Sequence, residues 1–179
     1  MVNITKPRLT RLQNDILRKL FIKTGSDINQ RQLALELDVS QPAIKKALPT
    51  LEKLDYVNVL KDQRLSISLN TKNHKVMQLK RVDNLTHLYE SDLVDFLEKE
   101  LPGATIILFG SFSRGEDTLD SDIDIAVIAR KEKKIDLEKY EKQFEREINI
   151  NYYESFRDIH KDLKENLANG ILLIGGFEL

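Results

Sequence analysis

The chain has 179 residues, of which 41% are hydrophobic and 32% charged, with a net charge of −1 and no cysteine. These totals exclude a disordered chain, a disulfide framework and a thiolate metal site. No apolar run approaches the roughly 18 residues of a bilayer span, and the first residues lack the apolar segment of a secretory signal. We therefore expect a cytoplasmic protein that has no membrane partner.

The charge is unevenly divided along the sequence. Residues 1–75 carry a net charge of +7, whereas residues 76–179 carry −8. Positive charge raises the local concentration of polyanions, so a basic front half and an acidic rear half suggest two units with different electrostatic tasks. Two solvated surfaces of unlike composition would give the same totals.

The front half predicts three helices followed by two short strands. Apolar residues recur at helical spacing in the helices, and the second strand alternates apolar with serine side chains. Ser40 is a good N-cap for the third helix, and Pro49 is expected to kink or break that helix near Ala47. The predicted helices cover 9–23, 29–37 and 40–54, and the predicted strands cover 56–60 and 65–69.

Three helices followed by a hairpin with a charged tip are the elements of a winged helix-turn-helix. Across about residues 8–70 the chain resembles the winged helices of ArsR- and MarR-like regulators. The resemblance implies that the third helix enters the major groove of double-stranded DNA, and by analogy a homodimer is expected. Glutamine would read base edges and the basic side chains would anchor phosphates. The predicted DNA-binding residues are Gln41, Lys45, Lys46, Lys61 and Arg64. The alternative is a module that contacts proteins.

The rear half predicts a mixture of helices and strands. A connecting helix over residues 73–91 carries Val76, Leu79, Val82, Leu85 and Leu88 as its apolar positions. Beyond it, helices are predicted over 92–101, 137–145 and 159–169, and strands over 105–109, 122–128, 148–150 and 171–174. The fold class is therefore α/β (α+β) with two domains, a winged helix-turn-helix over residues 1–72 and a small mixed sheet backed by helices over residues 92–179.

Two aspartates stand out at the start of the second of these strands. Residues two apart on a strand point to the same side, so Asp122 and Asp124 emerge together while Ile123 and Ile125 enter the core. Burying two like charges together is costly, and a hard divalent cation such as Mg²⁺ removes that cost. The alternative is a surface strand whose aspartates face solvent, but aspartate is a poor strand former.

A Gly-Ser pair leaves the preceding apolar strand. Gly110 lets the backbone approach a ligand closely. The backbone N–H groups of this corner and the Ser111 hydroxyl can donate hydrogen bonds to phosphate oxygens. Arg114 lies three residues further on and is expected to clamp the phosphate tail.

These residues form a recognisable pattern. Phe109-Gly110-Ser111, ten residues and then Asp122-Ile123-Asp124-Ile125 resemble the signature of the DNA polymerase beta-like nucleotidyltransferase superfamily, and Phe112-Ser113-Arg114-Gly115 with Ser121 resembles its minimal nucleotidyltransferase branch. The resemblance covers about residues 92–176. It implies that Asp122 and Asp124 hold Mg²⁺ or Mn²⁺, and that Gly110 and Ser111 hold a nucleoside triphosphate, expected to be ATP. It also implies transfer of a nucleoside monophosphate to a hydroxyl of a protein or nucleic acid.

One position departs from this pattern. The superfamily places a third carboxylate on a later strand, where this chain has Asn149, a weak metal ligand that cannot act as a base. Glu147 and Glu154 are the alternatives for the third acid. Whether the protein is an enzyme therefore stays open. The first hypothesis is a nucleotidyltransferase. The alternatives are a DNA-binding transcriptional regulator whose degenerate transferase domain senses a nucleotide, and an antitoxin-like partner of a toxin protein.

Overall fold

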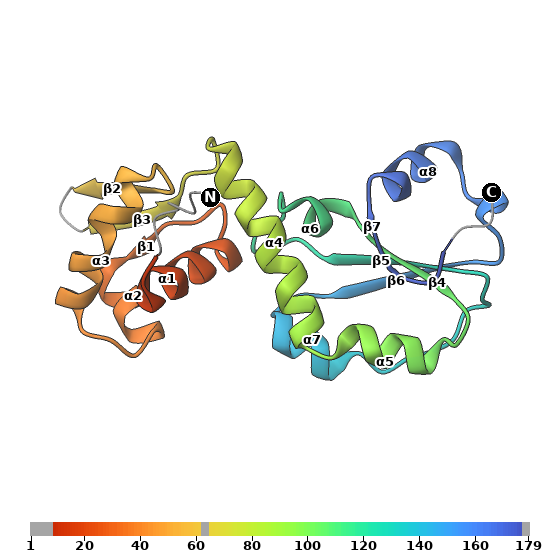
Figure 1. Ribbon diagram of the computed structural model, residues 1–179. Coiled ribbons are helices and arrows are strands. Elements are labelled where there is room, and N and C mark those ends of the chain that lie inside the picture. The colour runs from red at the N-terminus through yellow and green to blue at the C-terminus, as the bar shows by residue number, and fades with distance from the viewer. Residues whose placement is uncertain (1–8, 62–64, 177–179) are drawn as a thin grey trace, which may run out of the picture. The chain divides into compact units, whose positions relative to one another are not determined.

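A computed structural model describes residues 9–61 and 65–176 (Figure 1). Contacts between Cα atoms divide the chain into two compact units, Met1–Val76 and Met77–Leu179. Helices and two separate sheets make up the structure, so its class is mixed α/β. Within the described ranges, no helix combines the length and the hydropathy that crossing a bilayer requires.

The front unit contains three helices and a three-stranded antiparallel sheet. Its elements are α1 (Arg11–Ile22), β1 (Ile28–Asn29), α2 (Gln30–Glu36), α3 (Gln41–Lys53), β2 (Val57–Lys61) and β3 (Leu65–Leu69). The strand order is β1-β3-β2, so the predicted hairpin is confirmed. The two-residue strand β1, which the sequence analysis missed, pairs Ile28 with Ile67. Two residues are too few for an alternating pattern to be visible.

Side-chain caps and an apolar interior define the front helices. The Thr10 hydroxyl and the Gln13 side chain form a reciprocal capping box at the start of α1. The Ser40 hydroxyl accepts a hydrogen bond from the Ala43 N–H at 3.3 Å, which confirms the predicted N-cap of α3. The inner faces of the three helices pack in a core that includes Ile16, Leu20, Leu33, Ile44, Leu51 and Ile67.

The predicted break of the third helix is wrong. Helix α3 is continuous from Gln41 to Lys53, with Pro49 inside it. Proline lacks the N–H that would bond to the Lys45 carbonyl. Both Lys45 and Pro49 are exposed, so water can solvate that carbonyl, while Ile44, Leu48 and Leu51 hold the buried side of the helix in place.

We expect Pro49→Ala to stabilise the front unit. Alanine restores the backbone hydrogen bond and removes the ring clash, which cost about 3 kcal/mol in a helix interior. Because proline also reduces the freedom of the unfolded chain, we expect a net gain of about 1–2 kcal/mol. Urea denaturation measures this gain. Pro42→Ala is the matched control, since Pro42 lies in the first turn of α3, where proline is tolerated; an equal gain in both variants would contradict the prediction.

The rear unit is built on a four-stranded mixed sheet. Its strands are β4 (Thr105–Phe109), β5 (Ile123–Ile128), β6 (Ile148–Tyr153) and β7 (Ile171–Ile174), and its helices are α4 (His74–Glu90, in this unit from Met77), α5 (Leu93–Glu100), α6 (Gly110–Arg114), α7 (Glu138–Phe144), α8 (Lys161–Ala168) and the 3₁₀ turn η1 (Phe156–Asp158). The order is β6-β5-β4-β7, in which β4 is antiparallel to both neighbours and β5 is parallel to β6.

Each face of this sheet has its own apolar core. Ile123, Ile125 and Val127 of β5 belong to the cluster that contains residues of α5 and α7. Ala126 and Ile128, which alternate with them, belong to a second cluster with Leu167 of α8 and with Ile159, which precedes that helix. Figure 1 shows α5 and α7 on one side of the sheet and α8 on the other. The side chain of residue 124 therefore projects on the α8 side.

The predicted apolar stripe of α4 is confirmed in part: Val76 and Leu88 are fully buried, but two of its other members are not. Val82 is 63% exposed and Leu79 is 37% exposed. The buried positions of the helix in the rear unit are Lys80, Asn84 and Leu88, spaced by four residues. Periodicity of apolar residues identifies Leu88 but not Lys80 and Asn84, because these two are polar and are buried through specific partners.

Candidate metal and nucleotide site

Three polar side chains meet at one end of the rear sheet. Asp122 immediately precedes β5 and Asp124 is its second residue. In the parallel register of β5 and β6, Asp124 lies opposite Asn149, whose amide donates a hydrogen bond of 3.0 Å to the Asp122 Oδ2. Ile123 and Ile125 are fully buried in the core. The structure therefore brings together the two aspartates and the asparagine that the sequence analysis singled out.

Without a cation, burial and repulsion disfavour the presence of two ionised carboxylates at this end of the sheet. Burial raises the pKa of Asp124, and repulsion by the Asp122 carboxylate raises it further, while a hydrogen bond from Asn149 acts in the opposite direction. Asp122 itself is exposed. A cation beside both carboxylates would remove the repulsion and favour the ionised form of Asp124.

Gly110 lies directly against Asp124. Its φ is +74°, in the left-handed region, and a Cβ at this position would overlap the Asp124 carboxylate. Phe109, the last residue of β4, pairs with Asp124 across the sheet. The Gly-Ser corner thus approaches the carboxylates closely because residue 110 has no side chain.

The other two predicted ligand residues lie on α6, beside this corner. Ser111 is partly buried in the first turn of α6. Arg114, at the end of the helix, makes an exposed ion pair with Glu116, with 2.7 Å between Nε and Oε2. Exposed pairs of this kind contribute about 0–1 kcal/mol, so a phosphate group can compete for the arginine.

Neither of the two alternatives for the third acid, Glu147 and Glu154, joins this group. Glu147 is exposed in the segment before β6, and Glu154 lines a separate shallow depression with Arg130 and Tyr152. In residues 9–61 and 65–176, no cluster of three or more His, Asp or Glu side chains is arranged to hold a metal ion. Two carboxylates and one amide nevertheless suit a hard cation that keeps several water or phosphate ligands, as Mg²⁺ does.

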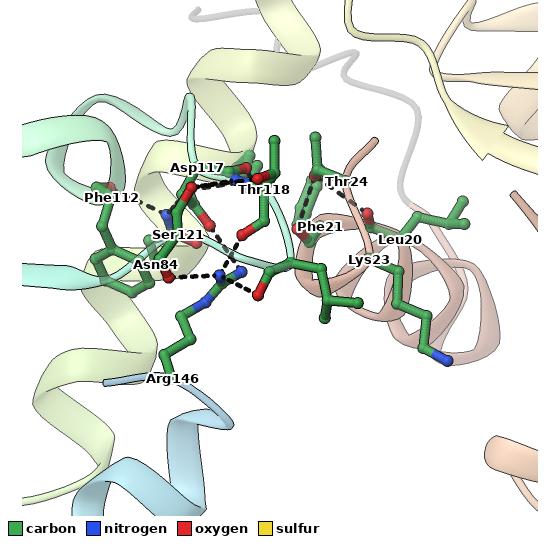
Figure 2. Close-up of polar contacts among 12 residues, drawn as sticks. Leu20, Phe21, Lys23, Thr24, Asn84, Phe112, Asp117, Thr118, Ser121 and Arg146 are labelled. Atoms are coloured by element: carbon green, nitrogen blue, oxygen red, sulfur yellow. Dashed lines mark hydrogen bonds and ion pairs between the residues drawn. The ribbon is translucent and has the colours of Figure 1, made fainter. Parts of the chain in front are cut away.

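The sequence analysis missed a buried polar network next to this site. Asp117 is 1% exposed and lies within 3.0 Å of both the Lys80 ammonium and the Arg146 guanidinium. Asn84 donates to Asp117 at 2.7 Å and to the Phe112 carbonyl at 3.0 Å. Figure 2 shows Asn84, Asp117 and Arg146 pointing toward one another. Lysine and arginine in a charged sequence are usually solvated, so nothing local marked these residues as buried.

The predicted DNA-binding side chains are accessible where they are described. Gln41, Lys45 and Lys46 are exposed on α3, and Lys61 is exposed at the end of β2. The Gln41 carbonyl accepts a hydrogen bond of 2.6 Å from the Gln30 side chain, which ties the start of α3 to α2. Arg64 lies outside the described residues.

Comparisons with known proteins support part of these interpretations. Residues 90–171 match the family model of the nucleotidyltransferase domain, which supports the resemblance found for the rear half. Among solved structures, the chain is similar to the crystal structure of the S. aureus MepR–DNA complex, with 20% identity, a TM-score of 0.37, and coverage of 51% of this chain and 81% of that chain. No curated protein sequence matches the chain.

Proposed function

We propose that the rear unit binds a nucleoside triphosphate together with a divalent cation and transfers a nucleoside monophosphate to a hydroxyl group. Asp122 and Asp124 would hold the cation, with Asn149 as a weak third ligand. Gly110 and Ser111 would bind the phosphates, and Arg114 would contact the phosphate tail. The proposed ligands are Mg²⁺ or Mn²⁺ and ATP, and the closest pattern is that of the minimal nucleotidyltransferase branch.

The main support for this proposal is the close approach of Gly110 to Asp124, which belong to separate parts of the sequence pattern. Gly110 leaves room for the Asp124 carboxylate, so the phosphate-binding corner and the cation-binding carboxylates meet at one end of the sheet. The family match over residues 90–171 supports the same assignment independently. When bound, the cation would neutralise phosphate charge and help to activate the attacking hydroxyl. The protein's own contribution is to hold the triphosphate and orient it.

Asp124→Asn tests the proposal. Loss of one of two carboxylate ligands is expected to weaken Mn²⁺–ATP binding by more than about 100-fold, since even changes behind metal ligands cost about 10- to 100-fold. Titration followed by Mn²⁺ electron paramagnetic resonance measures the affinity. The apoprotein should remain at least as stable as the wild type, because the raised pKa of Asp124 means that folding disfavours its charged form at neutral pH.

A matched control separates this effect from a general loss of charge. Asp120→Asn removes the same charge from an exposed position in the preceding loop and should leave the Mn²⁺–ATP affinity unchanged. Equal binding by wild type and Asp124→Asn would overturn the proposed site. Label from ATP appearing in an acceptor, and disappearing in Asp124→Asn, would identify the transfer reaction.

Asn149 favours a second candidate function. With an amide where the third acid is expected, the site can bind a nucleotide without turning it over, and the chain would then act as a DNA-bound regulator that senses the nucleotide. Tight Mn²⁺–ATP binding with no label transfer supports this candidate. Co-purification with a neighbouring toxin protein would favour the antitoxin-like alternative instead.

For the front unit we propose a winged helix-turn-helix that binds double-stranded DNA as a homodimer. The order of α1 to β3 and the exposed basic residues on α3 and β2 support this proposal. We place its boundary at residue 72 and treat residues 73–91 as the connecting helix.

Lys45→Ala and Lys46→Ala should each weaken DNA binding and make it less sensitive to salt. Each lost phosphate contact is expected to reduce the slope of log K against log salt by about 1. Gel-shift titrations at several salt concentrations measure that slope. Lys72→Ala removes an exposed lysine from the turn after β3 and is the control. A salt-independent affinity would favour the protein-contact alternative.

A further inference from the structure

The loop that joins the phosphate-binding corner to the cation-binding carboxylates runs from Gly115 to Ser121. Its internal hydrogen bonds join Thr118 and Ser121: the Thr118 N–H donates to the Ser121 hydroxyl at 2.9 Å, the Ser121 N–H donates to the Thr118 carbonyl at 3.2 Å, and the two hydroxyls lie 3.3 Å apart. The loop has no regular secondary structure, yet its last residue is joined directly to Asp122. The Ile123 N–H donates to the Glu147 carbonyl at 2.9 Å on the strand side of Asp122. On its other side, the position of Asp122 depends on what fixes the backbone of this loop.

Arg146 holds this loop through several hydrogen bonds. Its Nη1 donates to three loop carbonyls, those of Thr118, Leu119 and Ser121, the last two at 3.1 and 3.0 Å. Its Nη2 bonds to the Asp117 Oδ2 at 3.0 Å, and the side chain is only 4% exposed. A planar guanidinium can hold a carboxylate and several carbonyls at once, whereas a lysine ammonium cannot reproduce this arrangement.

A second set of contacts holds the other side of the loop against α4. The Lys80 ammonium lies 3.0 Å from the Asp117 Oδ1 and also donates to the Asp117 carbonyl. Gly115 approaches α4 so closely that a Cβ would lie 2.7 Å from the Met77 carbonyl oxygen. The loop is therefore held between α4 and Arg146, the second residue after α7.

This network of buried charges is not expected to contribute much to the stability of the fold. Two cationic side chains share one buried carboxylate, and buried ion clusters of this kind often contribute less stability than apolar residues of the same size. Burial accordingly lowers the pKa of Lys80, and the Asp117 carboxylate only partly opposes this effect. What the network provides is a defined backbone path toward Asp122.

We infer that Arg146 is a positioning residue for the metal–nucleotide site: through the carbonyls of Thr118, Leu119 and Ser121 it sets where Asp122 stands relative to Asp124. This inference rests on the proposed function. It assigns to Arg146 no contact with the nucleotide or the cation.

Arg146→Lys is the decisive variant, because it keeps the charge beside Asp117 and loses the multiple carbonyl contacts. We expect its Mn²⁺–ATP affinity to fall by about 10- to 100-fold. Amide hydrogen exchange of residues 118–122 should be faster than in the wild type even without ligand. Asp117→Asn removes the charge that Lys80 and Arg146 share and leaves the carbonyl contacts of Arg146. It should give a smaller loss of affinity and is the second variant if Arg146→Lys does not fold.

Leu97→Ala is the control for stability. Leu97 is fully buried in α5, and its truncation destabilises the same unit without touching the loop. Its affinity for Mn²⁺–ATP should stay within about twofold of wild type, since no ligand of the site is displaced. An Arg146→Lys protein that binds like wild type, or an affinity loss in Leu97→Ala equal to that in Arg146→Lys, would overturn the inference alone. Failure of the wild type to bind Mn²⁺–ATP would overturn the proposed function as well.

Discussion

Gly110→Ala is expected to weaken the affinity for Mn²⁺–ATP by at least about 10-fold, although it adds only one methyl group. The new Cβ would overlap the Asp124 carboxylate, and Asp124 must move or the corner must open. The positive φ adds strain of about 1–2 kcal/mol for any residue other than glycine. The measurements are the Mn²⁺–ATP dissociation constant and the free energy of unfolding in urea.

Substitutions of two other glycines in the rear unit distinguish the effect of steric overlap from the effect of backbone strain. Gly103 also has a positive φ, but its Cβ would meet only the flexible Arg130 guanidinium, at 3.1 Å. Gly103→Ala should therefore show the strain without the loss of binding. At Gly176 a Cβ would meet nothing within 4 Å, so Gly176→Ala should resemble wild type in both measurements. Equal loss of binding in Gly103→Ala and Gly110→Ala would show that steric overlap with Asp124 is not the cause.

Asn149→Asp is expected to strengthen divalent-cation binding by about 10-fold or more, since another carboxylate near the ion contributes about 1–4 kcal/mol of attraction. The amide it replaces lies 3.0 Å from the Asp122 Oδ2 and opposite Asp124 in the sheet. Without a cation, three neighbouring carboxylates repel one another, so the apoprotein should become less stable and should regain stability when Mg²⁺ is added.

Asn151→Asp is the matched control for this gain. It makes the same chemical change on the same strand but lies opposite Ala126. Titration of Mn²⁺ with and without ATP, and melting curves with and without Mg²⁺, compare the two variants. Label transfer from ATP that appears in Asn149→Asp and is absent from wild type would assign the natural protein to the nucleotide-sensing candidate. Unchanged cation affinity in Asn149→Asp would contradict the placement of the ion at this end of the sheet.

Much of the fold could be predicted from local sequence. The helices and strands of the front unit follow apolar spacing and side-chain caps, as at Ser40, and the alternation of β3 is visible in its serines. Pro49 was misjudged because a proline's cost depends on what surrounds it. Here the helix continues past Pro49 because its buried side is well packed and the unpaired carbonyl belongs to the exposed Lys45.

The residues of the candidate site could be singled out from the sequence, and their function as a site stays a prediction. Asp122 and Asp124 stand out because a strand's period of two places like charges side by side, and the Gly-Ser corner stands out because it follows an apolar strand. Asn149 was singled out by the resemblance, and the structure places it opposite Asp124 on the parallel strand. The close approach of Gly110 to Asp124 and the hydrogen bond from Asn149 to Asp122 required the sheet itself, since strand order and register are set by packing on both faces.

The sequence by itself determined the elements and the short motifs, because helix and strand periods, caps and turn residues act over a few neighbouring positions. Only the tertiary structure decided that Lys80, Asp117 and Arg146 are buried together around the loop that leads to Asp122. Burial of a charged side chain depends on partners that are distant in the chain, 37 residues away for Lys80 and 29 for Arg146. No local pattern of residues specifies such partners, because they meet only when the sheet and its helices have packed.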